Sequence, residues 1–176
     1  TMKNSVINSI KQQIISKGRA KFWFVDDFVA IGNNESVRKA LQQLTNEQML
    51  LRICHGVYYY PKIDRELGLG VLMPSKESTA LAIAKHAGLK IVPTGVFALN
   101  ALGITTQMQT VVAFLTNGRA RQIDLGSGKF IKFFHSSSQR LFEYKSYRMI
   151  LIIQAMTELG ENGMTDDVRS KLKEQV

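Results

Sequence analysis

The sequence has one cysteine, Cys54, and three scattered histidines among 176 residues. One cysteine excludes an internal disulfide, and this set of thiol and imidazole groups is too sparse for a zinc site. Apolar runs are also short. The run Met149–Ile153 is far below bilayer length, and the N-terminus lacks the continuous apolar core of a signal peptide. We therefore expect a cytoplasmic protein with no metal, no cofactor and no membrane partner.

Acidic residues are outnumbered, because 23 Lys and Arg against 14 Asp and Glu give a formal net charge of +9. Residues 1–70 hold 10 basic and 6 acidic residues, residues 71–145 hold 9 and 3, and residues 146–176 hold 4 and 5. The excess therefore covers most of the chain and spares its tail. Such a charge favours a polyanionic partner, and a 45% hydrophobic content is enough for a packed core.

The strongest local pattern lies between Asn34 and Pro61. Apolar residues recur three and four positions apart from an asparagine cap to about Asn46, which predicts an amphipathic helix. Two β-prone runs follow, residues 50–53 and 57–60, around the three-residue loop Cys54-His55-Gly56, in which glycine supplies a positive φ. A helix followed by a tight basic and aromatic hairpin is the order of a winged helix-turn-helix.

The residues before this pattern supply two further helices. The first begins near Asn4 or Ser5 and ends at Gly18, and a brief second helix runs from Asp26 or Asp27 to Gly32. Between them, residues 19–24 form a basic and aromatic connection whose aromatic side chains fill the core. Residues 1–61 thus make a winged helix-turn-helix domain.

Residues 62–74 contain two glycines and a bounding proline, which indicates a linker. The rest of the chain, residues 75–176, alternates helix and strand patterns. We expect helices over 76–87, 96–102, 147–159 and from 165 onward, and strands over 90–92, 111–115, 122–125 and 129–134. The fold class is therefore α+β: an N-terminal winged helix-turn-helix, then a small mixed α/β domain with antiparallel strands and C-terminal helices.

The polar face of the helix after Asn34 carries side chains that donate hydrogen bonds to phosphates and base edges. The alternative is an ordinary amphipathic helix with a solvated polar face, but the adjacent hairpin and the net charge favour DNA binding. We expect Lys39, Gln42 and Gln43 to face the major groove. Contacts to phosphate or the minor groove complete the predicted interface: Ser36 and Arg38 from the helix, and Arg52 and His55 from the wing.

A second basic segment surrounds the turn after residue 115. We predict a basic surface there that contacts DNA phosphate or an acidic partner protein, formed by Asn117, Arg119, Arg121, Lys129 and Lys132. The alternative is a set of solvated loop charges, and the sequence leaves both open.

No pattern indicates catalysis. Cys54 and His55 are adjacent on a turn, where sulfur and imidazole rarely align, and no third group orients them. The carboxylate pairs of the chain fall at helix starts, where capping explains them. Gly126-Ser127-Gly128 lacks the lysine-serine pattern of a phosphate-binding loop and is not followed by a helix, so it is a turn. We expect a protein that is not an enzyme.

Three segments in combination resemble the AbiEi-type antitoxins, prokaryotic transcriptional regulators of type IV toxin–antitoxin and abortive-infection systems. They are LLRICHGVYY at residues 50–59, TGVFALNALGITTQ at 94–107 and LTNGRAR at 115–121. The resemblance implies a DNA-binding repressor that acts on its own operon through inverted repeats. It also implies a partner, a nucleotidyltransferase-like toxin that the second domain neutralises. This chain departs from the longer members after Ser138, where its C-terminal region is short.

Two function classes thus remain. In the first, the protein is a DNA-binding repressor and antitoxin. In the second, it is a protein-interaction module that docks or neutralises a partner toxin, with the winged helix as scaffold. The operator sequence, the toxin and the oligomeric state stay open.

Overall fold

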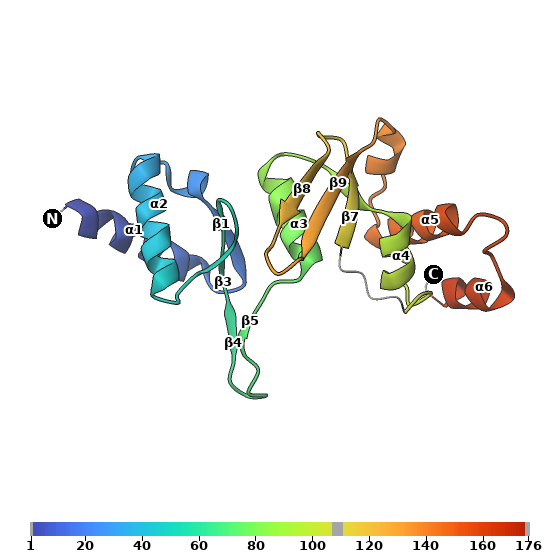
Figure 1. The fold of residues 1–176 in the computed structure, drawn as a ribbon, viewed down its shortest axis with the longest axis horizontal. Helices are drawn as coiled ribbons and strands as arrows, with labels where there is room; N and C mark the ends of the chain where they lie inside the picture. Colours follow the sequence, from blue (N-terminus) through green and yellow to red (C-terminus); the bar gives the residue numbers. More distant parts are fainter. Residues whose placement is uncertain (1, 107–110, 175–176) are drawn as a thin grey trace. The chain divides into compact units, whose positions relative to one another are not determined.

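The computed structural model describes residues 2–106 and 111–174, with side chains described from Val6 onward. The chain forms two compact units, residues 1–83 and 84–176 (Figure 1). Each unit combines helices with a small sheet, which confirms the α+β fold class.

The first unit starts with three helical segments around one strand and continues into a hairpin. Its elements are α1 (Met2–Lys17), β1 (Lys21–Phe24), the 3₁₀ helix η1 (Val25–Phe28), α2 (Asn34–Asn46), β2 (Leu51–Cys54) and β3 (Val57–Tyr60). The strands are antiparallel in the order β1-β3-β2. This order of helices, strand and hairpin is compatible with a winged helix.

The core of the first unit lies between the helices and one face of this sheet. Ile10 and Ile14 of α1 and Leu41 of α2 are fully buried, together with Phe28 of η1. The ring of Phe28 stacks on that of Trp23, with centroids 5.3 Å apart. The apolar stripes expected for both helices therefore meet across one shared core, which fixes α2 against the sheet.

Residues 19–24 are more than the connection expected from the sequence, because Lys21–Phe24 form the strand β1. β1 pairs along its whole length with β3, and Trp23 lies opposite Tyr58. The partner strand is far along the chain, so no local sequence pattern predicts this pairing. The brief helix that follows is a 3₁₀ turn, in which the Asp27 carboxylate accepts a hydrogen bond from the backbone N–H of Phe24 at 2.7 Å.

The hairpin of β2 and β3 has a two-residue loop, His55-Gly56, instead of the expected three-residue loop. Cys54 belongs to β2 and lies opposite Val57. Gly56 has φ +75°, as the sequence predicts for this position. A bulge at Ile53, between Arg52 and Cys54, shifts the register, and the strand continues to Cys54, which the sequence pattern had assigned to the loop.

The segment interpreted as a linker, residues 62–74, contains a second hairpin. Its strands β4 (Lys62–Asp64) and β5 (Gly70–Leu72) are antiparallel, with Ile63 opposite Val71. The flanking glycines suggested a linker, but Gly68 and Gly70 both adopt positive φ and bend the chain back on itself. The helix α3 (Lys76–His86) follows and starts where expected, with the Ser75 hydroxyl accepting from the backbone N–H of Ser78.

In the part of the second unit that the structure describes, a four-stranded sheet and four helical segments follow α3. They are β6 (Ile91–Pro93), α4 (Gly95–Ala101), β7 (Val111–Thr116), β8 (Arg121–Asp124), β9 (Phe130–His135), the 3₁₀ helix η2 (Gln139–Phe142), α5 (Tyr147–Leu159) and α6 (Asp166–Lys173). The strand order is β6-β7-β9-β8. The expected helices and strands are therefore present at nearly the expected bounds.

The pairing within this sheet differs from the antiparallel arrangement expected. β7 and β9 are parallel neighbours, and β9 lies between β7 and β8, so the segment 117–121 does not close a hairpin. The Gly126–Gly128 turn does join an antiparallel pair, β8 and β9. Phe114 of β7 is fully buried, and its ring centroid lies 5.4 Å from that of Phe97 on α4. This contact places α4 on one face of the sheet, because central strands must cover their apolar side chains.

Candidate nucleic-acid interface

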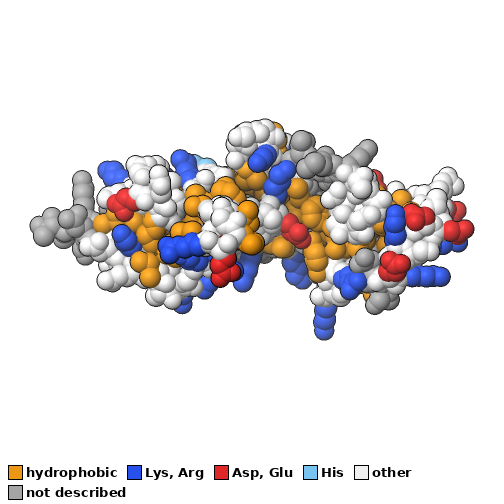
Figure 2. Space-filling model, turned by 90° about the horizontal axis from the view of Figure 1, so that it is seen from below, with side chains coloured by type: hydrophobic (Ala, Val, Ile, Leu, Met, Phe, Trp, Pro, Cys, Tyr) orange, Lys and Arg blue, Asp and Glu red, His pale blue; other side chains and the backbone are white. Residues whose placement is uncertain are grey.

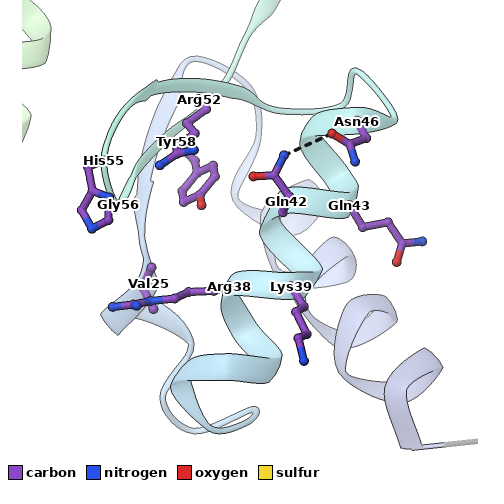
Figure 3. Close-up of a pocket in the computed structure, with 10 residues that line it drawn as sticks. All are labelled: Val25, Arg38, Lys39, Gln42, Gln43, Asn46, Arg52, His55, Gly56 and Tyr58. Atoms are coloured by element: carbon purple, nitrogen blue, oxygen red, sulfur yellow. Dashed lines mark hydrogen bonds between the residues drawn. The ribbon is translucent and has the colours of Figure 1, made fainter. Parts of the chain in front are cut away.

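A groove separates α2 from the β2–β3 hairpin in the first unit, with a volume of about 570 Å³ (Figure 3). Its walls are the exposed face of α2 on one side and the hairpin on the other. The lining side chains are Val25, Arg38, Lys39, Gln42, Gln43, Asn46, Arg52, His55, Gly56 and Tyr58. Six of the seven residues predicted to bind DNA lie here, from two elements that the core holds together.

The face of α2 that lines the groove is exposed because the opposite face of the helix packs in the core. Val37, Ala40, Leu41 and Leu44 are buried, so the polar side chains of the helix point outward. The helix begins at the predicted residue, and the Asn33 side chain accepts a hydrogen bond from the backbone N–H of Ser36 at 2.9 Å. Helix period and cap therefore determine which residues of α2 reach the groove.

The groove is basic. Arg38, Lys39, Arg52 and His55 line it, and no aspartate or glutamate is among the lining residues. Lys39 pairs with Glu35 one turn earlier, and Glu35 is not among the residues that line the groove. Among the residues that the structure describes, Arg38 and Arg52 have no ion-pair partner and are exposed. Two guanidinium groups are therefore available to an anionic ligand.

Two glutamines of α2 are held by residues one turn later. Gln42 Nε2 donates to Asn46 Oδ1 at 3.1 Å, and Gln43 Nε2 donates to Glu47 Oε1 at 3.0 Å. In Figure 3, Gln42 lies over the groove and Gln43 points away from the hairpin. A fixed amide loses less conformational entropy when it binds a base edge than a free one does.

The hairpin forms the second side of the groove and contributes an aromatic side chain to its lining. Arg52 lies opposite Tyr58 in the register of β2 and β3, and Tyr58 is only 5% exposed although it lines the groove. His55 stands at the tip of the turn beside Gly56. Strand pairing and the turn thus place one guanidinium and one imidazole opposite the polar face of α2 (Figure 3).

One predicted contact residue lies elsewhere. Ser36 lines a smaller groove between α1 and α2, beside Val6 and Ile7, and not the groove toward the hairpin. Helix geometry explains this position, because residue 36 lies on the α1 side of α2. Asn46 and Tyr58 were not predicted as site residues. The spacing of four between Gln42 and Asn46 could have indicated the first, but only the sheet register places Tyr58.

The five basic-surface residues of the second unit do not form one patch. Arg121 lies over the ring of Phe133, 5.3 Å from its centroid, while Lys132 is the next residue along β9 and so faces the opposite side of the sheet. Asn117 accepts a hydrogen bond from the backbone N–H of Lys90 at 2.9 Å. Arg119 is exposed beside it, and Lys129 lies in the turn at the other end of β8 and β9.

The described residues contain no group of three or more His, Cys, Asp or Glu side chains placed to hold a metal ion. Cys54, a cysteine of intermediate exposure, is the last residue of β2, and His55 follows it in the turn. Within the same part of the chain, every helix is too short or too polar to cross a membrane.

Comparison with curated proteins and with solved structures finds no match. Residues 9–176 match a family whose function is unknown, DUF6088. The match covers both units almost completely, and the chain therefore belongs to this family.

Proposed function

We propose that the protein is a DNA-binding transcriptional repressor whose first unit is a winged helix-turn-helix. In this proposal α2 enters the major groove of duplex DNA, and the β2–β3 hairpin lies over the adjacent backbone. The major groove is about 12 Å wide, which admits one α-helix with its side chains. The mechanism is occupancy of the operator, and it requires no catalytic step.

The observation that carries the proposal is the groove between α2 and the hairpin. It combines side chains that bind phosphate, Arg38 and Arg52, with amides that read base edges, Gln42 and Asn46. No carboxylate lines it, so a polyanion meets no repulsion from the groove itself. The net charge of +9 adds a long-range attraction to the same ligand.

The residues divide between two tasks. Lys39, Gln42 and Gln43 lie on the exposed face of α2 and are assigned to the bases. Arg38 is assigned to a phosphate, and Arg52 and His55 of the wing are assigned to the backbone or the minor groove. Ser36 is not part of this division, because it lines the groove toward α1.

The resemblance to AbiEi-type antitoxins extends the proposal to the biological setting. The protein would repress its own operon through inverted repeats and, through the second unit, neutralise a nucleotidyltransferase-like toxin. The support for this extension is the three sequence segments alone. Co-purification with the product of a neighbouring gene tests it directly.

The DNA-binding proposal is tested by binding to fluorescent duplexes selected from a random-sequence library. We expect wild-type affinity to fall steeply as salt rises, because phosphate contacts release counterions. Arg38→Ala and Arg52→Ala should each weaken binding to all sequences and reduce the salt slope by about 1. Arg169→Ala is the control, since it removes the same charge from an exposed position in α6.

Two results would contradict the proposal: a full chain that retains no duplex DNA even at low salt, or arginine variants that bind as tightly as the control. If the chain also co-purified with a partner protein, the first result would favour the alternative. In that case the protein is an interaction module, and the winged helix is its scaffold.

A further inference from the structure

The β4–β5 hairpin carries an exposed apolar face. Ile63 of β4 lies opposite Val71 of β5, and the two side chains are 42% and 50% exposed. Met73, the residue that follows β5, is 66% exposed. Figure 1 shows the hairpin extending away from the β1-β3-β2 sheet, and its tip points toward the viewer in Figure 2, where apolar side chains are visible.

The β4–β5 hairpin leaves backbone hydrogen-bonding groups unpaired along its edges. The sheet that contains it has only two strands, so each strand has one unpaired edge. A two-stranded hairpin is marginally stable in water at best, and it needs a further strand or a covering layer to be stable. An exposed edge with apolar side chains is also a template for pairing with another strand.

We infer that β4 pairs with β4 of a second copy of this chain, in an antiparallel ladder centred on Ile63. In this register Ile63 faces Ile63 of the other copy, and Lys62 faces Asp64 of the other copy, twice by symmetry. Directly opposite charges of opposite sign stabilise a strand pair. The result is a four-stranded sheet in the order β5-β4-β4-β5 with a two-fold axis.

The charges of β4 select this register over its neighbours. A centre on Lys62 places two lysines opposite each other, and a centre on Asp64 does the same with two aspartates. A centre between Ile63 and Asp64 places Lys62 opposite Arg65. Each of these three registers therefore sets like charges face to face, which destabilises a strand pair. A centre between Lys62 and Ile63 sets Ile63 opposite Lys62 and so loses the apolar contact. Only the Ile63-centred ladder satisfies both the apolar and the charged positions.

The same register completes the apolar face. Directly opposite residues of an antiparallel pair share a face, so Val71, Ile63 and their two counterparts form one continuous stripe across the four strands. Lys62 and Asp64 project on the other side. The contact involves few residues and falls at the small end of protein interfaces, so the dimer is weak and depends on concentration.

The experiment measures the mass of the full chain by sedimentation velocity, without DNA, over a range of concentrations. We expect a monomer to dimer transition for wild type. Ile63→Lys should abolish it, because a lysine then replaces the centre of the stripe on both copies. Leu67→Lys is the matched control: Leu67 is 77% exposed in the turn and lies outside the ladder, so its dimer should persist.

A charge exchange tests the register itself. Lys62→Asp alone places two aspartates face to face at each pair, and Asp64→Lys alone places two lysines face to face, so each variant should be monomeric. An equimolar mixture of the two restores both opposite-charge pairs and should dimerise. Far-ultraviolet circular dichroism of each variant checks that it is folded.

Three results would overturn the inference: a monomer at every concentration of wild type, a dimer that survives Ile63→Lys, or a mixture no more dimeric than its components. Because no DNA is present, these results leave the proposed DNA binding untouched. Conversely, loss of DNA binding in the arginine variants would not change the dimer.

Discussion

The side-chain amide of Gln42 donates a hydrogen bond to Oδ1 of Asn46, 3.1 Å away and one turn later in α2. This bond uses one of the two amide protons and leaves the second proton and the carbonyl oxygen of Gln42 for a ligand. A glutamine amide with one donor and one acceptor free matches the N7 and N6 positions of adenine in the major groove.

We therefore expect Gln42 to read an adenine if α2 enters the major groove. Gln42→Ala should remove the preference for adenine at one position of the selected duplexes, at a cost of about 1–3 kcal/mol. Asn46→Ala should weaken the preference for adenine at this position less, because it removes the hydrogen-bond partner of the Gln42 amide but not the amide itself. In a duplex with 7-deazaadenine at that position, wild type should lose affinity and Gln42→Ala should lose none further. Equal losses for both proteins would contradict the assignment.

The turn of the β2–β3 hairpin depends on Gly56. Its φ of +75° lies in the left-handed region, and a Cβ placed there would meet no atom within 4 Å. Gly56→Ala should therefore destabilise the first unit by about 1 kcal/mol, through backbone strain alone. Thermal unfolding followed by circular dichroism measures this effect.

Gly32→Ala is the control for that variant. Gly32 does not have a positive φ, and the closest contact of an added Cβ is an ordinary one, 3.4 Å from Val6. An equal loss of stability in the two variants would show that the turn conformation is not the cause.

The core of the first unit gives a matched pair of leucines. Leu41 is fully buried between the helices and the sheet, whereas Leu67 is 77% exposed in the β4–β5 turn. Leu41→Ala should lower the free energy of unfolding by about 2–5 kcal/mol, because it removes packed methyl groups and leaves a cavity. Leu67→Ala should change it by less than about 0.5 kcal/mol. Urea denaturation compares the two, and similar losses would contradict the placement of the core.

The second unit depends on a close approach at Gly95, the first residue of α4. A Cβ at this position would lie 2.8 Å from the backbone oxygen of Gln154 on α5. Gly95→Ala should therefore separate α4 from α5 and expose amides of both helices to hydrogen exchange. Val96→Ala, in the same helix at a side chain that is 46% exposed, is the control. Unchanged exchange in Gly95→Ala would show that the two helices are not in close contact.

The helical parts of the candidate site were predictable from the sequence. α2 begins and ends at the residues that its cap and its apolar period indicate, and its polar face carries the expected side chains. Ser36 shows the limit of this reasoning. It has the right chemistry and lies on the right helix, but it lies on the side of α2 that faces α1 and not on the side that faces the hairpin. The helix period predicts on which side of the helix a residue lies, but it does not predict which neighbouring element faces that side.

The pairing of the strands was less predictable than their positions in the sequence, for the same reason in both units. β1 pairs with β3, and β7 pairs with β9 instead of β8, so each strand finds its partner across a long stretch of chain. Residues 62–74 show the same limit on a smaller scale. Their glycines indicate the end of a helix or strand, but they do not distinguish an extended linker from a hairpin. Local residue preferences do not record which strand lies next to which.

The sequence by itself determined the positive charge, the α+β class and the polar face of α2, because composition and helix period are local properties of the chain. The tertiary structure decided that Arg52 and His55 stand across a groove from that face, and that Lys132 and Arg121 face opposite sides of a sheet. Both arrangements depend on strand pairing between distant residues. The hydrogen bonds and core contacts that select such pairs exist only once the chain has folded.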